Sequence, residues 1–213
     1  MKPRTDSTEH QNAISVEKMR ESDAYTIEHF TPSRELMYRA AQGVYSHMEW
    51  EGKRVAIISG SGNNGGDGYA LAGILSEQGV PVYIYRTSEK FSSDGQYYYQ
   101  QAQEKGVPSQ MFSEGQSLSG YDIVVDCILG TGFQGIPRDL AAAAIQEINR
   151  CGAFVVSVDI NSGMNGDTGE AELAVKSDLT VSIGFYKTGM FSGKASELIG
   201  DLVNVDIGIV LKP

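Results

Sequence analysis

The sequence predicts an α/β domain of the doubly wound class, in which helices cover both faces of a mostly parallel sheet. Short apolar segments alternate with helical segments along most of the chain, which is the pattern of that class. The apolar segments are almost continuously hydrophobic, as expected for strands that are buried on both faces. Polar clusters that contain glycine follow the ends of these segments, where ligands bind in such sheets. With 213 residues the chain is long enough to bury a sizeable core.

Individual elements can be placed from the same pattern. Strands are expected at residues 54–59, 82–85, 122–127, 154–158, 179–183 and 202–205, and helices between them at 66–78, 93–105 and 139–150. Two more helices precede the first strand, over residues 14–29 and after a cap at Thr31 or Ser33. We expect residues 1–12 to form a disordered tail and residues 13–213 a single domain.

The second of these early helices carries an apolar stripe at helical spacing. Such a stripe is typical of a core, but it also suits an oligomer interface, and from it we expect a homodimer. Its members are Leu36, Met37, Ala40, Ala41, Val44, Tyr45 and Met48.

Composition excludes several classes of protein. The chain has 17 Lys+Arg against 27 Asp+Glu, for a net charge of -10, which argues against nucleic acid as a partner. No apolar run is long enough to span a bilayer, and the N-terminus lacks a signal-peptide core, so we expect no membrane association. Cys127 and Cys151 form neither a disulfide framework nor a metal-ligand spacing. These features together predict a cytoplasmic protein.

The most informative motif is the run at residues 60–68, Gly-Ser-Gly-Asn-Asn-Gly-Gly-Asp-Gly. Five glycines allow positive φ and close approach to a ligand, and the N–H groups at the start of the following helix favour phosphate. A plain turn needs only one or two glycines, so the run predicts a ligand site. It is not a dinucleotide redox fingerprint, because no acidic residue ends the next strand, which finishes at Arg86.

Two aspartates stand at the ends of expected strands, Asp126 and Asp159. A carboxylate placed there points into the crevice and needs a partner, although either one can instead cap the following loop. The oxygens of Asn64, Asp126 and Ser162 suit a weakly held cation better than zinc or a redox metal. Lys187 can bind phosphate, donate a proton, or be a solvated surface lysine.

Taken together, these motifs resemble the YjeF N-terminal family, the NAD(P)H-hydrate epimerases, from about residue 14 to residue 209. The resemblance rests on residues 62–68, 125–132 and 158–163, supported by Met19, Arg20, Asp23 and residues 33–37. It implies a Rossmann-like, three-layer α/β/α sandwich with extra N-terminal helices. It also implies an isomerase of nucleotide repair, which interconverts the R and S epimers of hydrated NADH and NADPH (NADHX and NADPHX). No redox cofactor is needed, because the nucleotide is itself the substrate.

The resemblance also assigns roles to residues. It implies one potassium ion per subunit, held by Asn64, Asp126 and Ser162. Asp159 is implied as the acid/base group, with Lys187 assisting. The substrate would be bound by Asn63, Asn64, Gly65, Gly66, Asp67, Gly130, Thr131, Gly132, Phe133, Gln134, Gly135, Ile136 and Asp159.

The sequence departs from the family at Asn161, where many relatives have proline, and we expect the backbone to be looser there. Many bacterial relatives are fused to an ADP- or ATP-dependent dehydratase, so we expect a separate dehydratase partner for a chain that ends at Pro213. Lys187 or Arg86 could favour the extra phosphate of NADPHX. Two alternatives stay open: a non-catalytic nucleotide-binding or interaction module of the same fold, and a nucleotide-binding transferase.

Overall fold

The computed structural model describes residues 12–213, which are built around one seven-stranded sheet in which all paired strands are parallel. The strand order is β3-β2-β1-β4-β5-β6-β7, so the chain winds outward from β1 and then returns to its other side. The predicted doubly wound α/β class is confirmed. The strands are β1 (Val55–Ser59), β2 (Val82–Arg86), β3 (Ser109–Met111), β4 (Ile123–Cys127), β5 (Phe154–Val158), β6 (Ser177–Ile183) and β7 (Ile199–Val205).

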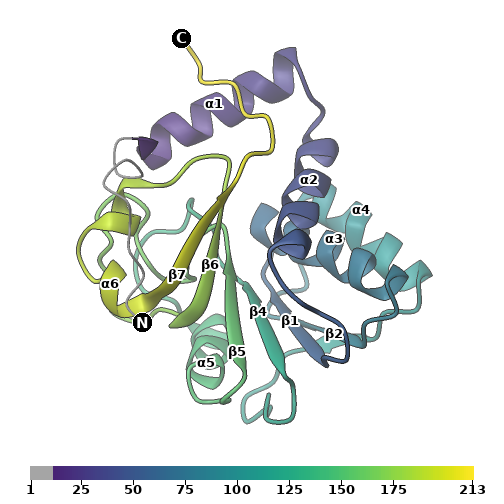
Figure 1. Cartoon of the computed structure of the whole chain (residues 1–213). Helices are drawn as coiled ribbons and strands as arrows, with labels where there is room; N and C mark the ends of the chain where they lie inside the picture. The colour runs from purple at the N-terminus through teal and green to yellow at the C-terminus, as the bar shows by residue number, and fades with distance from the viewer. Residues whose placement is uncertain (1–11) are drawn as a thin grey trace.

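Helices cover both faces of this sheet (Figure 1). Ile57 of β1 packs in one core with Leu71 of α3, whereas its neighbour Ile58 packs in a second core with Ile145 of α5. Because consecutive strand residues face opposite cores, the strands read as continuous apolar runs. The helices are α1 (Val16–His29), α2 (Ser33–Ser46), α3 (Asn63–Glu77), α4 (Ser93–Glu104), α5 (Asp139–Ile148) and α6 (Ala195–Leu198), with a 3-10 helix η2 (Thr188–Phe191).

Helix α1 lies across the end of the sheet, with the C-terminal segment beside it (Figure 1). Its first turn is held by Ser15, whose hydroxyl accepts a hydrogen bond from the N–H of Lys18, and by Asp167, which accepts one from the N–H of Val16. Further along, the N–H of Val210 donates to the Thr26 hydroxyl at 2.9 Å. Both ends of the helix are therefore fixed to later parts of the chain.

The ends of several predicted elements were wrong. Pro32 occupies the N-cap position of α2, and neither Thr31 nor Ser33 makes a capping bond. Helix α3 begins at Asn63, three residues before the predicted start. The sequence pattern also failed to indicate β3, η2 and α6, which are only three or four residues long and carry no readable period. Of the predicted tail, residues 1–11 lie outside the described residues, and the single-domain boundary stays a prediction.

None of the glycines of the 60–68 run has a φ in the left-handed region. Four of the five instead allow close packing, and Gly62 has open space around it. A Cβ on Gly60 would lie 1.9 Å from the carbonyl oxygen of Ile128, and one on Gly65 would lie 2.2 Å from that of Gly60. A Cβ on Gly66 would lie 2.5 Å from Cε of Met37. Most of the run is thus the first turns of α3, pressed against its neighbours.

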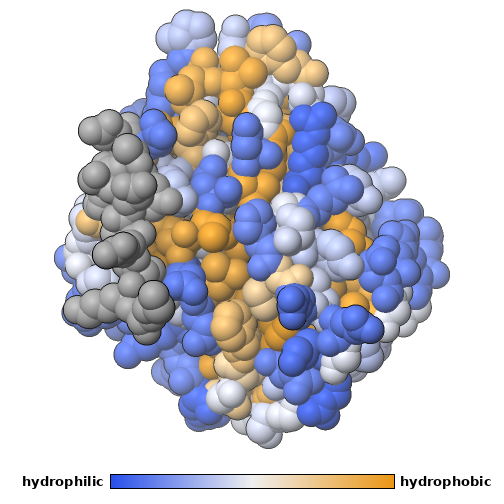
Figure 2. Space-filling model, in the orientation of Figure 1, coloured by the Kyte–Doolittle hydropathy of each residue, from blue (hydrophilic) through white to orange (hydrophobic). Residues whose placement is uncertain are grey.

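The apolar stripe of α2 belongs to the core of this chain. Leu36, Met37, Ala40, Ala41 and Val44 are buried, and Tyr45 and Met48 pack against the same cluster. Apolar residues remain visible between hydrophilic ones on the face shown in Figure 2, including at the top, where α1 and the C-terminal segment lie in Figure 1. No helix in residues 12–213 has the length and apolar character needed to cross a membrane.

Candidate active site

A cavity of about 490 Å³ opens at the carboxyl edge of the sheet. It is lined by residues 61–64 after β1, residues 128–133 after β4, and Asp159 after β5. Helices α1 and α2 supply the facing wall, including Met19, Asp23 and Met37. Strands β1 and β4 are the neighbours at which the strand order reverses, so the cavity lies where ligands bind in doubly wound sheets.

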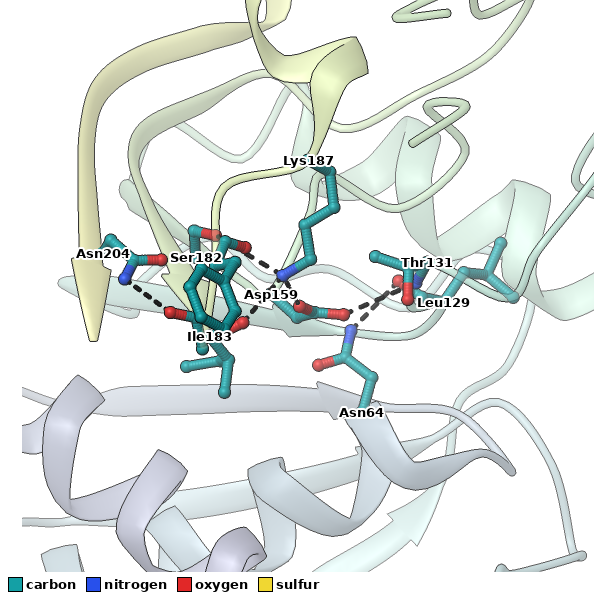
Figure 3. Close-up of polar contacts among 10 residues, drawn as sticks. Asn64, Leu129, Thr131, Asp159, Ser182, Ile183, Lys187 and Asn204 are labelled. Carbon is teal, nitrogen blue, oxygen red and sulfur yellow. Dashed lines mark hydrogen bonds and ion pairs between the residues drawn. The ribbon is translucent and has the colours of Figure 1, made fainter. Parts of the chain in front are cut away.

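Asp159 and Lys187 form an ion pair at this cavity (Figure 3). The Lys187 Nζ lies 2.5 Å from Asp159 Oδ1, and it also donates to the carbonyl oxygen of Ile183 at 2.9 Å and to the Ser182 hydroxyl at 3.4 Å. The Lys187 side chain is 0% exposed, whereas that of Asp159 is 18% exposed. The interpretation of Lys187 as a solvated surface residue is therefore wrong. All three ammonium protons have acceptors within the protein, which leaves none free for a phosphate.

The backbone around Asp159 explains how this carboxylate reaches Lys187. Asp159 has a φ of 68°, in the left-handed region that residues with a Cβ rarely adopt. The N–H of Ile160 donates to the carbonyl oxygen of Val158 at 2.8 Å, closing a three-residue turn directly after β5. The N–H of Asp159 itself donates to the carbonyl oxygen of Val181 on β6. A conformation of this kind costs about 1–3 kcal/mol and is found mainly at functional sites.

Asn161 fixes this turn instead of loosening it, so that expectation was wrong. Its side-chain amide donates to the carbonyl oxygens of Val175 and Leu198 and to the Ser177 hydroxyl, at 2.9–3.0 Å. Its Oδ1 accepts a hydrogen bond from Thr180 at 2.7 Å. The residue is fully buried, so its polar atoms replace the rigidity that proline would supply.

Asp126 is fully buried within β4 and does not line the cavity. Its Oδ1 accepts hydrogen bonds from the N–H of Ile128 and the hydroxyl of Ser162, and its Oδ2 accepts from the Ser157 hydroxyl and the N–H of Ser162. Burial raises the pKa of Asp126, and these hydrogen bonds act in the opposite direction. The expectation that Asp126 points into the crevice was wrong, because its carboxylate is enclosed by donors from Ile128, Ser157 and Ser162.

The three residues proposed as cation ligands nevertheless lie together. Ser162 bonds directly to Asp126, and its hydroxyl also accepts from the N–H of Leu129 at 2.8 Å. The Asn64 amide donates to the carbonyl oxygen of Leu129 at 3.0 Å (Figure 3). The Oδ1 of Asn64 is buried and, within the described part of the chain, has no hydrogen-bond partner. A buried acceptor without a donor fits a cation ligand, and the surrounding oxygens are of the hard type.

Three further carboxylates line the cavity: Asp67 on α3, Asp23 on α1 and Asp94 on α4. Burial, then the negative charge of Asp159 and then that of Asp23, raises the pKa of Asp67 well above its usual range, and Lys187 offsets only part of this effect. Burial followed by the charge of Asp159 also raises the pKa of Asp23. Asp67 was predicted to bind substrate, whereas Asp23 had been assigned no role at the site.

Most of the residues predicted to contact the substrate line the cavity, but two of the glycines do not. Asn63, Asn64 and Asp67 line the cavity, as do Asp159 and residues 130–133. Gly65 and Gly66 do not, because both are buried in the packing of α3.

Residues 134–136 lie away from this cavity. They border a separate hollow of about 340 Å³, and Phe133 borders both spaces. The structure thus separates the predicted 130–136 binding loop into two halves at Phe133.

Arg20 is a cavity residue to which the sequence pattern assigned no role. Among the residues described, it is the one cationic side chain that lines the cavity. Two signals in the sequence could have found it: Arg20 and Asp23 are three positions apart and share one face of α1, and both support the family resemblance. Arg86, an expected phosphate contact, lies outside the cavity with its guanidinium over the rings of Phe91 and Tyr99.

Comparison with known proteins gives consistent matches over most of the chain. Residues 33–189 match a family model described as YjeF-related protein N-terminus. An NAD(P)H-hydrate epimerase of Oenococcus oeni is 35% identical over 92% of this chain and 96% of its own length. One from Limosilactobacillus fermentum is 32% identical over 92% and 97%.

Longer relatives and a solved structure extend this comparison. A bifunctional NAD(P)H-hydrate repair enzyme of Coxiella burnetii is 30% identical over 90% of this chain but only 40% of its own length. The crystal structure of the yeast protein ynu0 superimposes with a TM-score of 0.71 over 90% of this chain and 86% of that one. At 22% sequence identity, the yeast structure supports the fold alone.

Proposed function

This chain belongs to the family described as the YjeF-related protein N-terminus, and on that premise we propose that it is an NAD(P)H-hydrate epimerase. As an isomerase it interconverts the R and S epimers of NADHX and NADPHX, the hydrated forms of NADH and NADPH. Support comes from relatives of that name that match more than nine-tenths of both chains.

The observation that carries the chemistry is the Asp159–Lys187 pair at the cavity. Epimerisation requires the C–O bond beside the ring nitrogen to break and to form again on the opposite face. The nitrogen lone pair stabilises the resulting cation, and a fixed carboxylate nearby stabilises it electrostatically. A carboxylate can also take a proton from the attacking water. Lys187, which donates a hydrogen bond to Asp159, would hold this carboxylate in position for both tasks.

A potassium ion fits the proposal as a resident cation. Asn64, Asp126 and Ser162 would hold it, and the unpartnered Oδ1 of Asn64 supports this assignment. Such an ion would supply positive charge close to an anionic nucleotide. Within residues 12–213 no group of three or more His, Cys, Asp and Glu side chains gathers as a metal site, so oxygen donors of other kinds would carry the binding.

Removing the Asp159 carboxylate tests the function. Asp159→Asn should lower R/S interconversion by about 10²–10⁴-fold, the range for loss of an acid/base group. The readout is an S-specific dehydratase that has exhausted the S epimer in a mixed pool and resumes when this protein is added. Asp201→Asn, on an exposed residue of β7, is the charge-matched control.

The possible outcomes test the epimerase function and the role of Asp159 separately. A wild-type chain that binds NADP but never restarts the dehydratase would indicate a non-catalytic module. A fully active Asp159→Asn would remove Asp159 from the mechanism. Because this variant leaves Lys187 buried without its carboxylate, the double variant Asp159→Asn/Lys187→Met and a thermal unfolding curve distinguish chemical loss from unfolding.

The proposal extends to the surroundings of the enzyme. A separate dehydratase would consume the S epimer that this chain supplies, in a cytoplasmic setting that suits the two free cysteines. A homodimer would have to use apolar residues other than the buried α2 stripe. Exposed candidates are Ile27 and Phe30 on α1 and the adjoining linker, with Val210 and Leu211 in the C-terminal segment. Molar mass in solution, with and without Phe30→Ser, tests the dimer.

A further inference from the structure

Two of the carboxyl groups that line the cavity lie in contrasting environments. Asp159 is ion-paired to a fully buried lysine. Asp67, in the second turn of α3, lines the same cavity from another wall. Its carboxyl group has neither a hydrogen bond nor an ion pair with any residue of the described chain, and it is only partly exposed. When two carboxyl groups of one active site lie in environments that differ in this way, one commonly acts as the acid and the other as the base.

The reaction needs both roles. A hydroxyl group leaves carbon readily only when it is protonated and departs as water. Asp159 is less well placed to supply that proton, because its Oδ1 already accepts a hydrogen bond from the ammonium of Lys187 at 2.5 Å. Asp94 also lines the cavity, but its carboxylate is paired with Arg34 at 3.2 Å. Asp67 and Asp23 remain as candidate acids.

We propose that Asp67 is the catalytic acid, donating its proton to the departing hydroxyl group, while Asp159 accepts the proton of the water that adds to the opposite face. This inference rests on the proposed epimerase function. The C–O bond breaks, water leaves, and the nitrogen lone pair forms a C=N bond. A water molecule then attacks the ring carbon, the C=N electrons return to nitrogen, and the proton of the water passes to Asp159. Exchange with solvent returns the proton to Asp67, and the reverse reaction uses the two groups in exchanged roles.

The charged groups around Asp67 support a proton-bearing acid there. They come from three separate elements: Asp23 on α1, Asp159 after β5, and Lys187 before η2. The two negative charges and the burial of the group raise the pKa of Asp67, and the positive charge only partly offsets this. Burial and then the charge of Asp159 also raise the pKa of Asp23, but the pKa of Asp67 is raised well above its usual range. Asp23 lies on the facing wall formed by α1, where its negative charge helps to hold the proton on Asp67.

The test compares pH profiles of kcat. Asp67→Asn should lower kcat at least 100-fold with a much smaller change in KM, and its residual rate should lose the wild-type fall at high pH. Asp23→Asn removes a negative charge that holds the proton on Asp67, so the high-pH limb should move to lower pH while Asp67 still donates. Asp201→Asn serves as the charge-matched surface control.

The outcomes distinguish this proposal from the function on which it rests. A wild-type chain without epimerase activity overturns the function itself. A wild-type chain that is active, together with an Asp67→Asn variant of normal kcat, overturns only the role of Asp67. A high-pH limb that Asp23→Asn leaves in place would also overturn it, because that limb would then belong to another group. Thermal unfolding of each variant confirms that a lost rate is not a lost fold.

Discussion

Asp126 and Asp159 follow similar apolar segments and stand at the ends of neighbouring parallel strands, yet the structure uses them differently. Asp126 is enclosed in β4 with four hydrogen-bond donors on its two oxygens. Asp159 lies one residue past β5, turned by a left-handed φ toward Lys187 and partly open to the cavity. A difference of two residues in position relative to the strand end thus separates a carboxylate that organises the loops from one that can meet a substrate.

The largest expected effect is on the free energy of unfolding, and it tests whether Asp126 holds the loops together. Asp126→Ala leaves three buried donors without an acceptor, because only the Ser162 hydroxyl keeps another one, the carbonyl oxygen of Leu129. Each orphaned donor costs about 1–3 kcal/mol, so we expect a loss of about 3 kcal/mol or more in the free energy of unfolding. Asp126→Asn keeps the shape and should cost less. Urea unfolding measures both, with Asp201→Asn as the exposed control. A loss below about 1 kcal/mol for Asp126→Ala would mean that these bonds do not hold the two loops together.

A smaller effect tests the potassium ion that we propose to bind beside Asp126. If potassium binds the folded chain at Asn64, Asp126 and Ser162, it stabilises that state by about 1.4 kcal/mol at ten times its Kd. The thermal unfolding temperature in KCl should therefore exceed that in choline chloride at equal ionic strength. Asn64→Ala removes the unpartnered Oδ1 and should abolish the difference. A difference that persists in this variant would place the ion elsewhere.

A third effect concerns Asp67 at the cavity and the pH dependence of stability. The pKa of Asp67 is raised in the folded protein, so the folded state holds this proton more tightly than the unfolded state. Stability from this group is present below the unfolded pKa of about 3.9 and is lost as the pH rises through the folded pKa, with a slope of about 1.4 kcal/mol per pH unit between the two values. Asp67→Asn should therefore be more stable than wild type at neutral pH. Equal unfolding free energies for the two proteins across the pH range would contradict the raised pKa.

The strand pattern made the fold readable from sequence, because both faces of β1, β4 and β5 are buried and their residues are accordingly apolar. The short β3 and α6 were not readable, since three or four residues cannot show a period. Asn161 was misread for a different reason. A proline acts through its own φ, whereas Asn161 acts through partners at residues 175–180 and 198, which sequence alone does not bring together.

Some features of the candidate site could likewise be predicted from the sequence, and others could not. Asn64, Asp126 and Ser162 were named together from their residue types, and the structure places them around Leu129. The burial of Lys187 could not be read from its sequence neighbours, since it depends on Asp159, directly after β5, and on Ser182 of β6 as acceptors. The place of Asp23 in the cavity depends on how α1 crosses the sheet edge, and the irregular pattern of that helix gave no direction.

By itself the sequence determined the parallel α/β class, the glycine-rich start of α3 and the chemical types at the carboxyl edge. Each is local, because burial pattern, glycine spacing and side-chain chemistry are written in consecutive residues. Only the tertiary structure decided that the glycines serve packing, that Lys187 is buried against Asp159, and that Asp67 stands unpaired beside two other carboxylates. These depend on distances between residues that are far apart in the chain, and it is those distances that set which carboxyl group keeps its proton.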